Sequence, residues 1–183
     1  EDRLYQATRC WLIWLQGLFA SRPAGRHRGN ADPNETEILI TDQSAEHLET
    51  TNKRPIIVTS RGPAQWMGMS RDQVASRSFD GTIKTISDSI ACTMTISCVA
   101  REGVEAQELA YIIFRMIPVF KPSIQRLGNL HAIGNQIAVS AETQQGTIIP
   151  GSSTPEWKMV RLTVPFYLQD VISAEEEGFH SVM

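Results

Sequence analysis

The sequence predicts an α+β fold: a single, mostly antiparallel β-sheet with an N-terminal helix and a central amphipathic helix packed on one face. Helical and strand periodicities follow the order helix, strands, long strand, helix, two strands, which is typical of helices segregated to one side of a sheet. A length of 183 residues with 42% hydrophobic residues fits one domain with a buried core. We expect this domain to cover residues 1–170.

The N-terminal half supplies a helix and two short strands. Apolar residues at helical spacing predict a helix over residues 2–20. Residues 21–35 are rich in Pro, Gly, Arg and Asn and predict an exposed loop or linker. Short β-branched runs predict strands at 37–41 and 54–59. We expect residues 61–80 to form a long loop with a large apolar tip.

The C-terminal half begins with the clearest strand. Alternation of apolar and polar residues over 81–100 predicts a long strand with one face buried. Residues 102–120 change to helical spacing, and we expect Pro118 and Pro122 to end this helix. The residues assigned to its apolar face are Val104, Leu109, Ile113, Met116, Ile117 and Phe120.

Two more strands are expected, one near residues 131–143 and one at 156–168, because alternation returns in both. The loop between them, residues 144–155, is longer than a tight hairpin needs and has an apolar tip. Residues 171–183 are expected to form an acidic tail that adds nothing to the core.

Charge is segregated along the chain although the net charge is only -3. Basic residues outnumber acidic ones in residues 1–30 and 53–77, whereas the segment from Asp170 onward contains four acidic residues and no Lys or Arg. The basic segment 53–77 and the acidic terminus are candidates to meet across a subunit boundary, or are ordinary solvated segments. The basic residues are mostly Arg, which favours planar contacts with carboxylates or phosphates.

The cysteines and the apolar runs place limits on the class of protein. Cys92 and Cys98 lie about 20 Å apart along the predicted strand, too far for a disulfide, so we expect buried thiols in a reducing compartment. The run from Cys10 to Ala20 is too short and too interrupted to span a membrane. We also find no signal-peptide pattern.

The sequence offers no motif for catalysis, for a cofactor or for a metal ion. The four His lie in different segments, without the spacing of a metal site. Neither a nucleophile elbow nor a phosphate-binding glycine loop occurs. We therefore expect no enzyme, and a site assembled from Asp80, Asp88 and His131 is the weakest alternative.

Aromatic residues, Met and Arg, with little Lys, are typical of protein interfaces. The predicted helix over 2–20 carries two Trp, more than a thin apolar stripe needs, so part of it is expected to contact another chain. A small nucleic-acid-binding domain that uses the loop from Arg61 to Arg77 is the alternative. The predicted interface residues are Trp11, Trp14, Arg61, Trp66, Met67, Met69, Arg71, Ile148 and Ile149.

The order of elements resembles the tail-terminator and neck proteins of long-tailed bacteriophages. An N-terminal helix precedes a strand of the form RPIIVTSRG, and TMTISCVAREGVEAQELAYIIFRMI runs from a strand straight into an amphipathic helix. IGNQIAVSAE and WKMVRLTVPFYLQ then close the domain. The loop at 21–35 and the acidic tail have no counterpart in that pattern.

This resemblance implies a structural virion protein without an active site or cofactor. Such proteins form a ring, expected to be hexameric, at the head-proximal end of the tail, where they end polymerisation of the tail tube and provide the head-docking surface. The implied partners are further copies of the chain, the tail tube protein and a head completion or connector protein, with DNA passing through the lumen. The implied location is the virion tail or neck, and the host cytoplasm during assembly. A head-to-tail joining protein of similar fold is equally compatible with the pattern.

Overall fold

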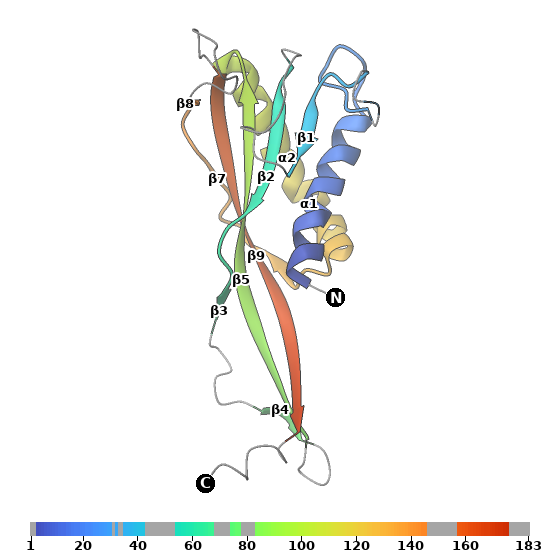
Figure 1. Cartoon of the computed structure of the whole chain (residues 1–183), viewed down its shortest axis with the longest axis vertical. Coiled ribbons are helices and arrows are strands. Elements are labelled where there is room, and N and C mark those ends of the chain that lie inside the picture. Colours follow the sequence, from blue (N-terminus) through green and yellow to red (C-terminus); the bar gives the residue numbers. More distant parts are fainter. Residues whose placement is uncertain are drawn as a thin grey trace.

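Two long antiparallel strands, β5 (Ile83–Ala100) and β9 (Trp157–Glu175), form the axis of the molecule (Figure 1). This computed structural model describes residues 3–30, 32, 35–42, 54–67, 74–77, 83–145 and 157–175, with only the backbone described at 74–77, 83–88, 145, 170 and 172–175. The other elements are α1 (Arg3–Ala20), β1 (Leu39–Thr41), β2 (Ile56–Arg61), β3 (Gln65–Trp66), β4 (Val74–Arg77), α2 (Gly103–Gly128), β6 (Ala132–Ile133), β7 (Ala138–Val139) and β8 (Thr143–Gln145).

All of these strands belong to one sheet. The order is β1-β2-β5-β9-β6, with β3 and β4 also pairing with β5, and β7 and β8 also pairing with β9. β1 runs parallel to β2, and every other described pair is antiparallel. Together with the two helices, this arrangement confirms the predicted α+β class.

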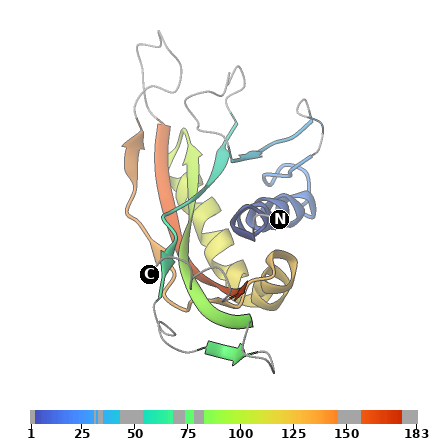
Figure 2. The ribbon, with the colours of Figure 1, turned by 60° about the horizontal axis from the view of Figure 1, so that its bottom comes forward.

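The alternation along β5 and β9 decides which face of the sheet is buried. Their register runs from Ile83 opposite Glu175 to Ala100 opposite Lys158. Residues of the same parity face the same side, and α1 and α2 cover the side with the larger core cluster (Figure 2). The core residues that β5 and β9 contribute to it are Cys92, Met94, Ile96, Cys98, Ala100, Val160, Leu162, Val164, Phe166 and Leu168.

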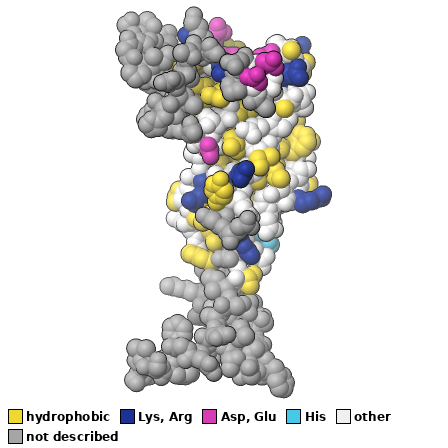
Figure 3. Space-filling model, turned by 45° about the vertical axis from the view of Figure 1, so that its right-hand side comes forward, with side chains coloured by type: hydrophobic (Ala, Val, Ile, Leu, Met, Phe, Trp, Pro, Cys, Tyr) yellow, Lys and Arg dark blue, Asp and Glu magenta, His cyan; other side chains and the backbone are white. Residues whose placement is uncertain are grey.

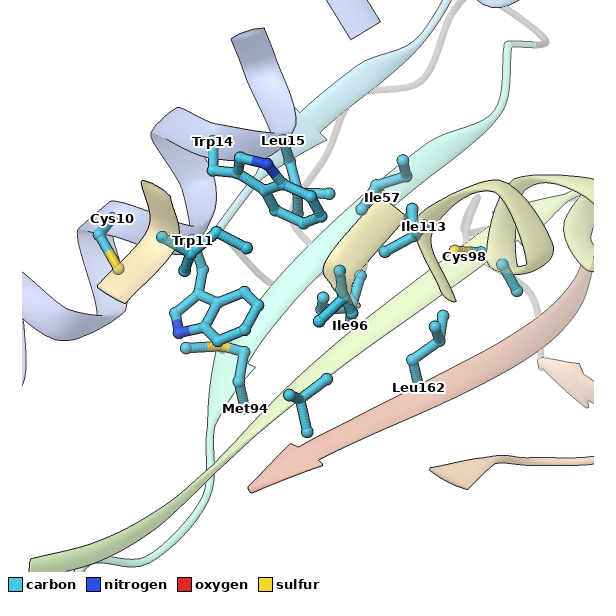
Figure 4. Close-up of a cluster of buried hydrophobic side chains, with 14 of the residues drawn as sticks. Cys10, Trp11, Trp14, Leu15, Ile57, Met94, Ile96, Cys98, Ile113 and Leu162 are labelled. Carbon is cyan, nitrogen blue, oxygen red and sulfur yellow. The ribbon is translucent and has the colours of Figure 1, made fainter. Parts of the chain in front are cut away.

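The tryptophans of α1 fill this core (Figure 4). Trp11 is 0% exposed, and its ring meets that of Trp14 edge-on at 6.0 Å between centroids. The ring centroid of Trp11 also lies 6.4 Å from that of Phe166 in β9, and the ring centroid of Trp14 lies 6.4 Å from that of Phe120 in α2. The two tryptophans therefore join the helices to the sheet, since aromatic pairs at these distances add to the stabilisation from area burial.

The prediction that prolines end the second helix was wrong. α2 continues through Pro118 and Pro122 and ends at Gly128, with Asn129 in the left-handed conformation as its C-cap. The prolines are four residues apart and exposed, so the carbonyl groups that lose their partners face solvent. The helix changes direction along its length (Figure 2), as expected of a proline kink, while its buried residues continue as far as Ile124 and Gly128.

The loop at 21–35 is tied to the body in its described part. The Glu37 carboxylate accepts hydrogen bonds from the backbone N–H groups of Gly25, at 2.6 Å, and Arg28, at 2.9 Å. The N–H of Gly29 donates to the carbonyl of Phe19 at 3.1 Å, folding the loop back against α1. The expected loop is therefore present, and it has a fixed path where it is described.

Three other predicted segments differ from the structure. The loop at 61–80 contains β3 and β4, which pair with β5. The strand expected near 131–143 is broken into β6, β7 and β8, and Pro165 of β9 faces the gap between β6 and β7, where no N–H is needed. β9 extends beyond the expected boundary at residue 170 to Glu175, so the acidic terminus begins inside the sheet.

The sheet extends beyond the helices as an arm. The end of the β5–β9 pair that contains Ile83 and Glu175, with β4 beside it, projects past the part of the sheet that α1 and α2 cover (Figure 1). In the arm, Arg77 is the register partner of Lys84, and Lys84 is the partner of Ala174. The end of the basic segment and the start of the acidic terminus thus lie on opposite sides of β5 within one chain, separated by that strand.

Candidate functional site

The chemistry of the described residues gives no candidate catalytic centre. Within the described ranges, no group of three or more His, Cys, Asp or Glu side chains could hold a metal ion. Asp88 is the register partner of Asp170 in the arm, and His131 is an exposed residue before β6. Asp80, the third residue proposed for an enzyme site, lies outside the described residues.

The three cysteines are buried and free, as the sequence predicted for Cys92 and Cys98. Burial raises the pKa of Cys10 and of Cys98 to about 12, and it also raises the pKa of Cys92. A thiol is a nucleophile only as the thiolate. These cysteines therefore act as small core residues.

One titratable carboxyl has a pKa changed by hydrogen bonding. The backbone N–H of Gly25, and then that of Arg28, lower the pKa of Glu37 below its ordinary value. Both bonds hold the loop at 21–35 in place. The shift is explained by this structural contact and indicates no catalytic role.

One concave feature of the surface is a groove between α2 and the sheet edge at β7 and the residues that follow it, which we call the α2 groove. It encloses about 710 Å³. Its apolar residues are largely exposed: Val104 is 76% exposed and Tyr111 58%. The residues that line it are Val104, Gln107, Glu108, Tyr111, Phe114, Val139, Ser140, Ala141, Glu142 and Val160.

The polar groups of the α2 groove are acidic or neutral. Glu142 is held in place, because it accepts a hydrogen bond from Gln107 at 3.1 Å and lies 3.6 Å from the ammonium group of Lys158. Glu108 is exposed on the same side of α2, one turn from Tyr111. The groove is thus apolar in its lining, with carboxylates among its polar groups.

Acidic residues continue from the groove toward the start of α2. Glu102, Glu105 and Glu108 line a neighbouring depression together with Arg101 and His27, and Glu105 lies 3.7 Å from Nδ1 of His27. In the view of Figure 3, most of the visible Asp and Glu side chains lie toward the top, and hydrophobic side chains reach the surface over the body.

The predicted interface residues divide into three groups. Trp66 is 53% exposed and Met67 43%, and Arg61 is also exposed, so all three are accessible for contact. Trp11 and Trp14 are core residues, and the expectation that they contact another chain is corrected. The remaining four, Met69, Arg71, Ile148 and Ile149, lie outside the described residues.

The prediction for Trp11 and Trp14 was wrong for a physical reason. A helix that packs against both a sheet and a second helix needs a wide apolar face. Trp11 turns to the sheet and Trp14 to α2, so both rings are used within the chain.

Sequence reasoning missed the α2 groove. Val104 and Phe120 were assigned to the buried face of the helix, but Val104 is 76% and Phe120 38% exposed. The available signal was the spacing of Val104, Tyr111 and Phe114, which places apolar residues on a second side of the helix, away from Leu109 and Ile113.

No helix among the described residues is long and apolar enough to cross a membrane. A comparison of the sequence with family models and with curated proteins finds no match.

Proposed function

We propose that this chain is a ring-forming structural protein of a phage tail, a tail terminator that ends polymerisation of the tail tube and provides the surface for head docking. The observation that carries the proposal is the exposed apolar surface of α2 and the neighbouring sheet edge. Monomeric proteins rarely expose large contiguous apolar patches, whereas subunits of assemblies do. The largest exposed apolar residues of this surface are Val104, Tyr111, Phe114 and Val139.

Two further features support the proposal. The order of α1, short strands, β5, α2 and β9 is the order on which the resemblance to tail-terminator and neck proteins was based. The sheet also has two different edges, one at β1 to β4 and one at β6 to β8. A closed ring is built from head-to-tail contacts between two different surfaces of each subunit, which such edges can supply.

The first experiment is the native mass of the purified protein, measured by native mass spectrometry over a range of protein and salt concentrations. A species near six times 20.4 kDa, or a ring that forms only when tail tubes are added, would support the proposal. Tail tubes assembled with the protein should also stop growing and should bind connector-bearing heads.

A persistent monomer that ignores tail tubes would contradict the proposal. If such a monomer bound oligonucleotides with an affinity that fell steeply with salt, the nucleic-acid alternative would replace it. Rings that bind heads but leave tube growth unchanged would instead indicate a head-to-tail joining protein.

A further inference from the structure

The α2 groove has the features of a receptor for an aromatic side chain. Its volume of about 710 Å³ lies in the range of binding pockets. Tyr111 and Phe114 present their rings from the helix, and Val139 faces them from β7. An aromatic anchor in such a setting gains more than area burial, because ring pairs add a specific attraction.

The charge of the groove restricts what it can accept. Among the residues that line it, Glu108 and Glu142 are acidic and none is basic. Glu142 already has Lys158 and Gln107 as partners, whereas no such partner is seen for Glu108 within the described residues. The complementary ligand therefore combines an apolar group with a cation.

The same chain carries such a combination on the opposite edge of its sheet. Residues 61–67 are exposed except for Gly62, which is partly buried, and include Arg61, Trp66 and Met67, which we call the β3 patch. β3 pairs with β5 on one side, and its other side faces no described strand. Trp and Arg are the residues most often found at the energetic centres of protein interfaces.

We infer that the β3 patch of one copy of this chain docks in the α2 groove of the next copy. Trp66 packs against Tyr111 and Phe114, and Arg61 pairs with Glu108. This inference rests on the proposed function and deepens it, because it names the two surfaces through which the ring subunits meet.

The positions of the two surfaces favour a head-to-tail contact over a symmetric dimer. The β3 patch lies on the β5 side of the sheet and the α2 groove on the β9 side. One partner cannot cover both edges at once, so each copy binds one neighbour through its patch and another through its groove. Repetition of this contact gives a ring when the rotation closes.

The two surfaces are also offset along the strands. Trp66 is the register partner of Ile90 in β5, and Ile90 is the register partner of Leu168 in β9. Val139 is the register partner of Leu162, six residues before Leu168 in β9. This offset corresponds to about 20 Å along a strand. A closed ring has no rise between subunits, so the strands must be inclined to the ring axis, as they are in barrels.

The test breaks each surface separately in the full chain and then mixes the broken copies. Trp66→Ala removes the patch and leaves the groove, and Tyr111→Ala does the reverse. We expect each variant alone to weaken self-association at least about tenfold, measured by sedimentation velocity over a concentration series. In the mixture, the intact β3 patch of Tyr111→Ala can bind the intact α2 groove of Trp66→Ala, and no further contact can form. The mixture should therefore give a dimer near twice 20.4 kDa and no larger species.

A charge exchange checks the pairing within the contact. Arg61→Glu and Glu108→Arg should each weaken self-association, and the double variant should recover most of it. Tyr5→Ala and Arg26→Glu are matched controls, because Tyr5 and Arg26 are exposed residues outside both surfaces. Far-UV circular dichroism and thermal unfolding of every variant exclude loss of folding as the cause.

The outcomes separate this inference from the proposed function. Rings that form normally from both single variants, or a mixture that stays monomeric, would overturn the inference while leaving the ring itself intact. Loss of tail-tube binding in Tyr111→Ala without loss of self-association would also overturn it, since the groove would then receive the tube protein. If the predicted mixed dimer forms but wild-type rings do not bind tail tubes, the proposed function fails and the contact stands.

Discussion

At the residue scale, the tryptophans divide into core and surface positions that local composition does not distinguish. Trp11 is 0% exposed and Trp66 53%. We expect Trp11→Ala to lower the free energy of unfolding by about 3–5 kcal/mol, and Trp66→Ala to change it by less than about 0.5 kcal/mol in dilute monomer. Urea unfolding measures both. An equal cost for the two variants would contradict the positions of these side chains.

The buried thiols give a second prediction at this scale. Because burial raises the pKa of Cys10 and Cys98 to about 12, almost no thiolate forms at pH 8 in the folded protein. We expect Ellman's reagent to react with the native protein far more slowly than with a free thiol, and with all 3 cysteines in denaturant. Rapid labelling of the native protein at pH 8 would show that the core around these thiols opens readily.

At the element scale, Glu37 couples the loop at 21–35 to pH. The pKa of Glu37 is lowered in the folded state. The ionised carboxylate therefore stabilises the folded loop fully at a pH above the ordinary pKa of Glu, and this stabilisation is lost as the pH falls through the lowered pKa. We expect the protection of the Gly25 and Arg28 amides to decline over that acidic window, as measured by hydrogen exchange corrected for the intrinsic rate. Glu37→Gln should remove this pH dependence, and Glu108→Gln, on α2, should leave it unchanged. An unchanged profile in Glu37→Gln would assign the pH effect to another group.

The packing of α1 on α2 depends on a glycine. A Cβ atom at Gly128 would overlap the sulfur of Cys10, which is itself buried. We expect Gly128→Ala to destabilise the protein by about 1–3 kcal/mol. Adding Cys10→Ala frees the space, so the double variant should lose less stability than the sum of the two single variants. Strict additivity in urea unfolding would mean that the helices do not meet at this point.

The elements that the sequence predicted best are those with a long periodic pattern. In α1, β5 and the first half of α2, many apolar residues recur at one spacing and form one face. The prediction of each element therefore depends on the repeated spacing and not on any single residue. Pro118 and Pro122 misled the prediction because their effect depends on whether the carbonyl groups four residues earlier face solvent. The short strands β3 and β4, and the breaks that separate β6, β7 and β8, could not be predicted, since these strands are ordered by pairing with β5 and β9 rather than by their own sequence.

At the scale of the whole molecule, the sequence predicted one of the two proposed interface surfaces, the β3 patch, and missed the other. The predominance of Arg over Lys was visible in the sequence, but Trp11 and Trp14, which were predicted as interface residues, fill the core. The α2 groove combines residues of α2 with Val139 of β7 and with residues 140–142. The kinked end of the helix and β6 lie between these two parts in the sequence. Such a surface exists only after the chain has folded. The spacing of apolar residues in the sequence could therefore indicate the helix side or the strand side of the groove separately, but not the shape that the two sides form together.

The arm gives the last prediction, because it is the part of the β5–β9 pair that the helices leave uncovered (Figure 1). In the body, α1 and α2 cover one face of these strands, and β2 pairs with β5. In the arm, the additional strand that pairs with β5 is β4, which has four residues. Two- or three-stranded sheets without a packed face are marginally stable in water. In dilute monomer we therefore expect hydrogen exchange to be slowest at Ile96 and Leu162 and to quicken toward Ile86 and Ile172, reporting opening of the arm alone. Uniform protection along both strands would contradict this gradient and would mean that the arm is covered by another copy of the chain even at low concentration.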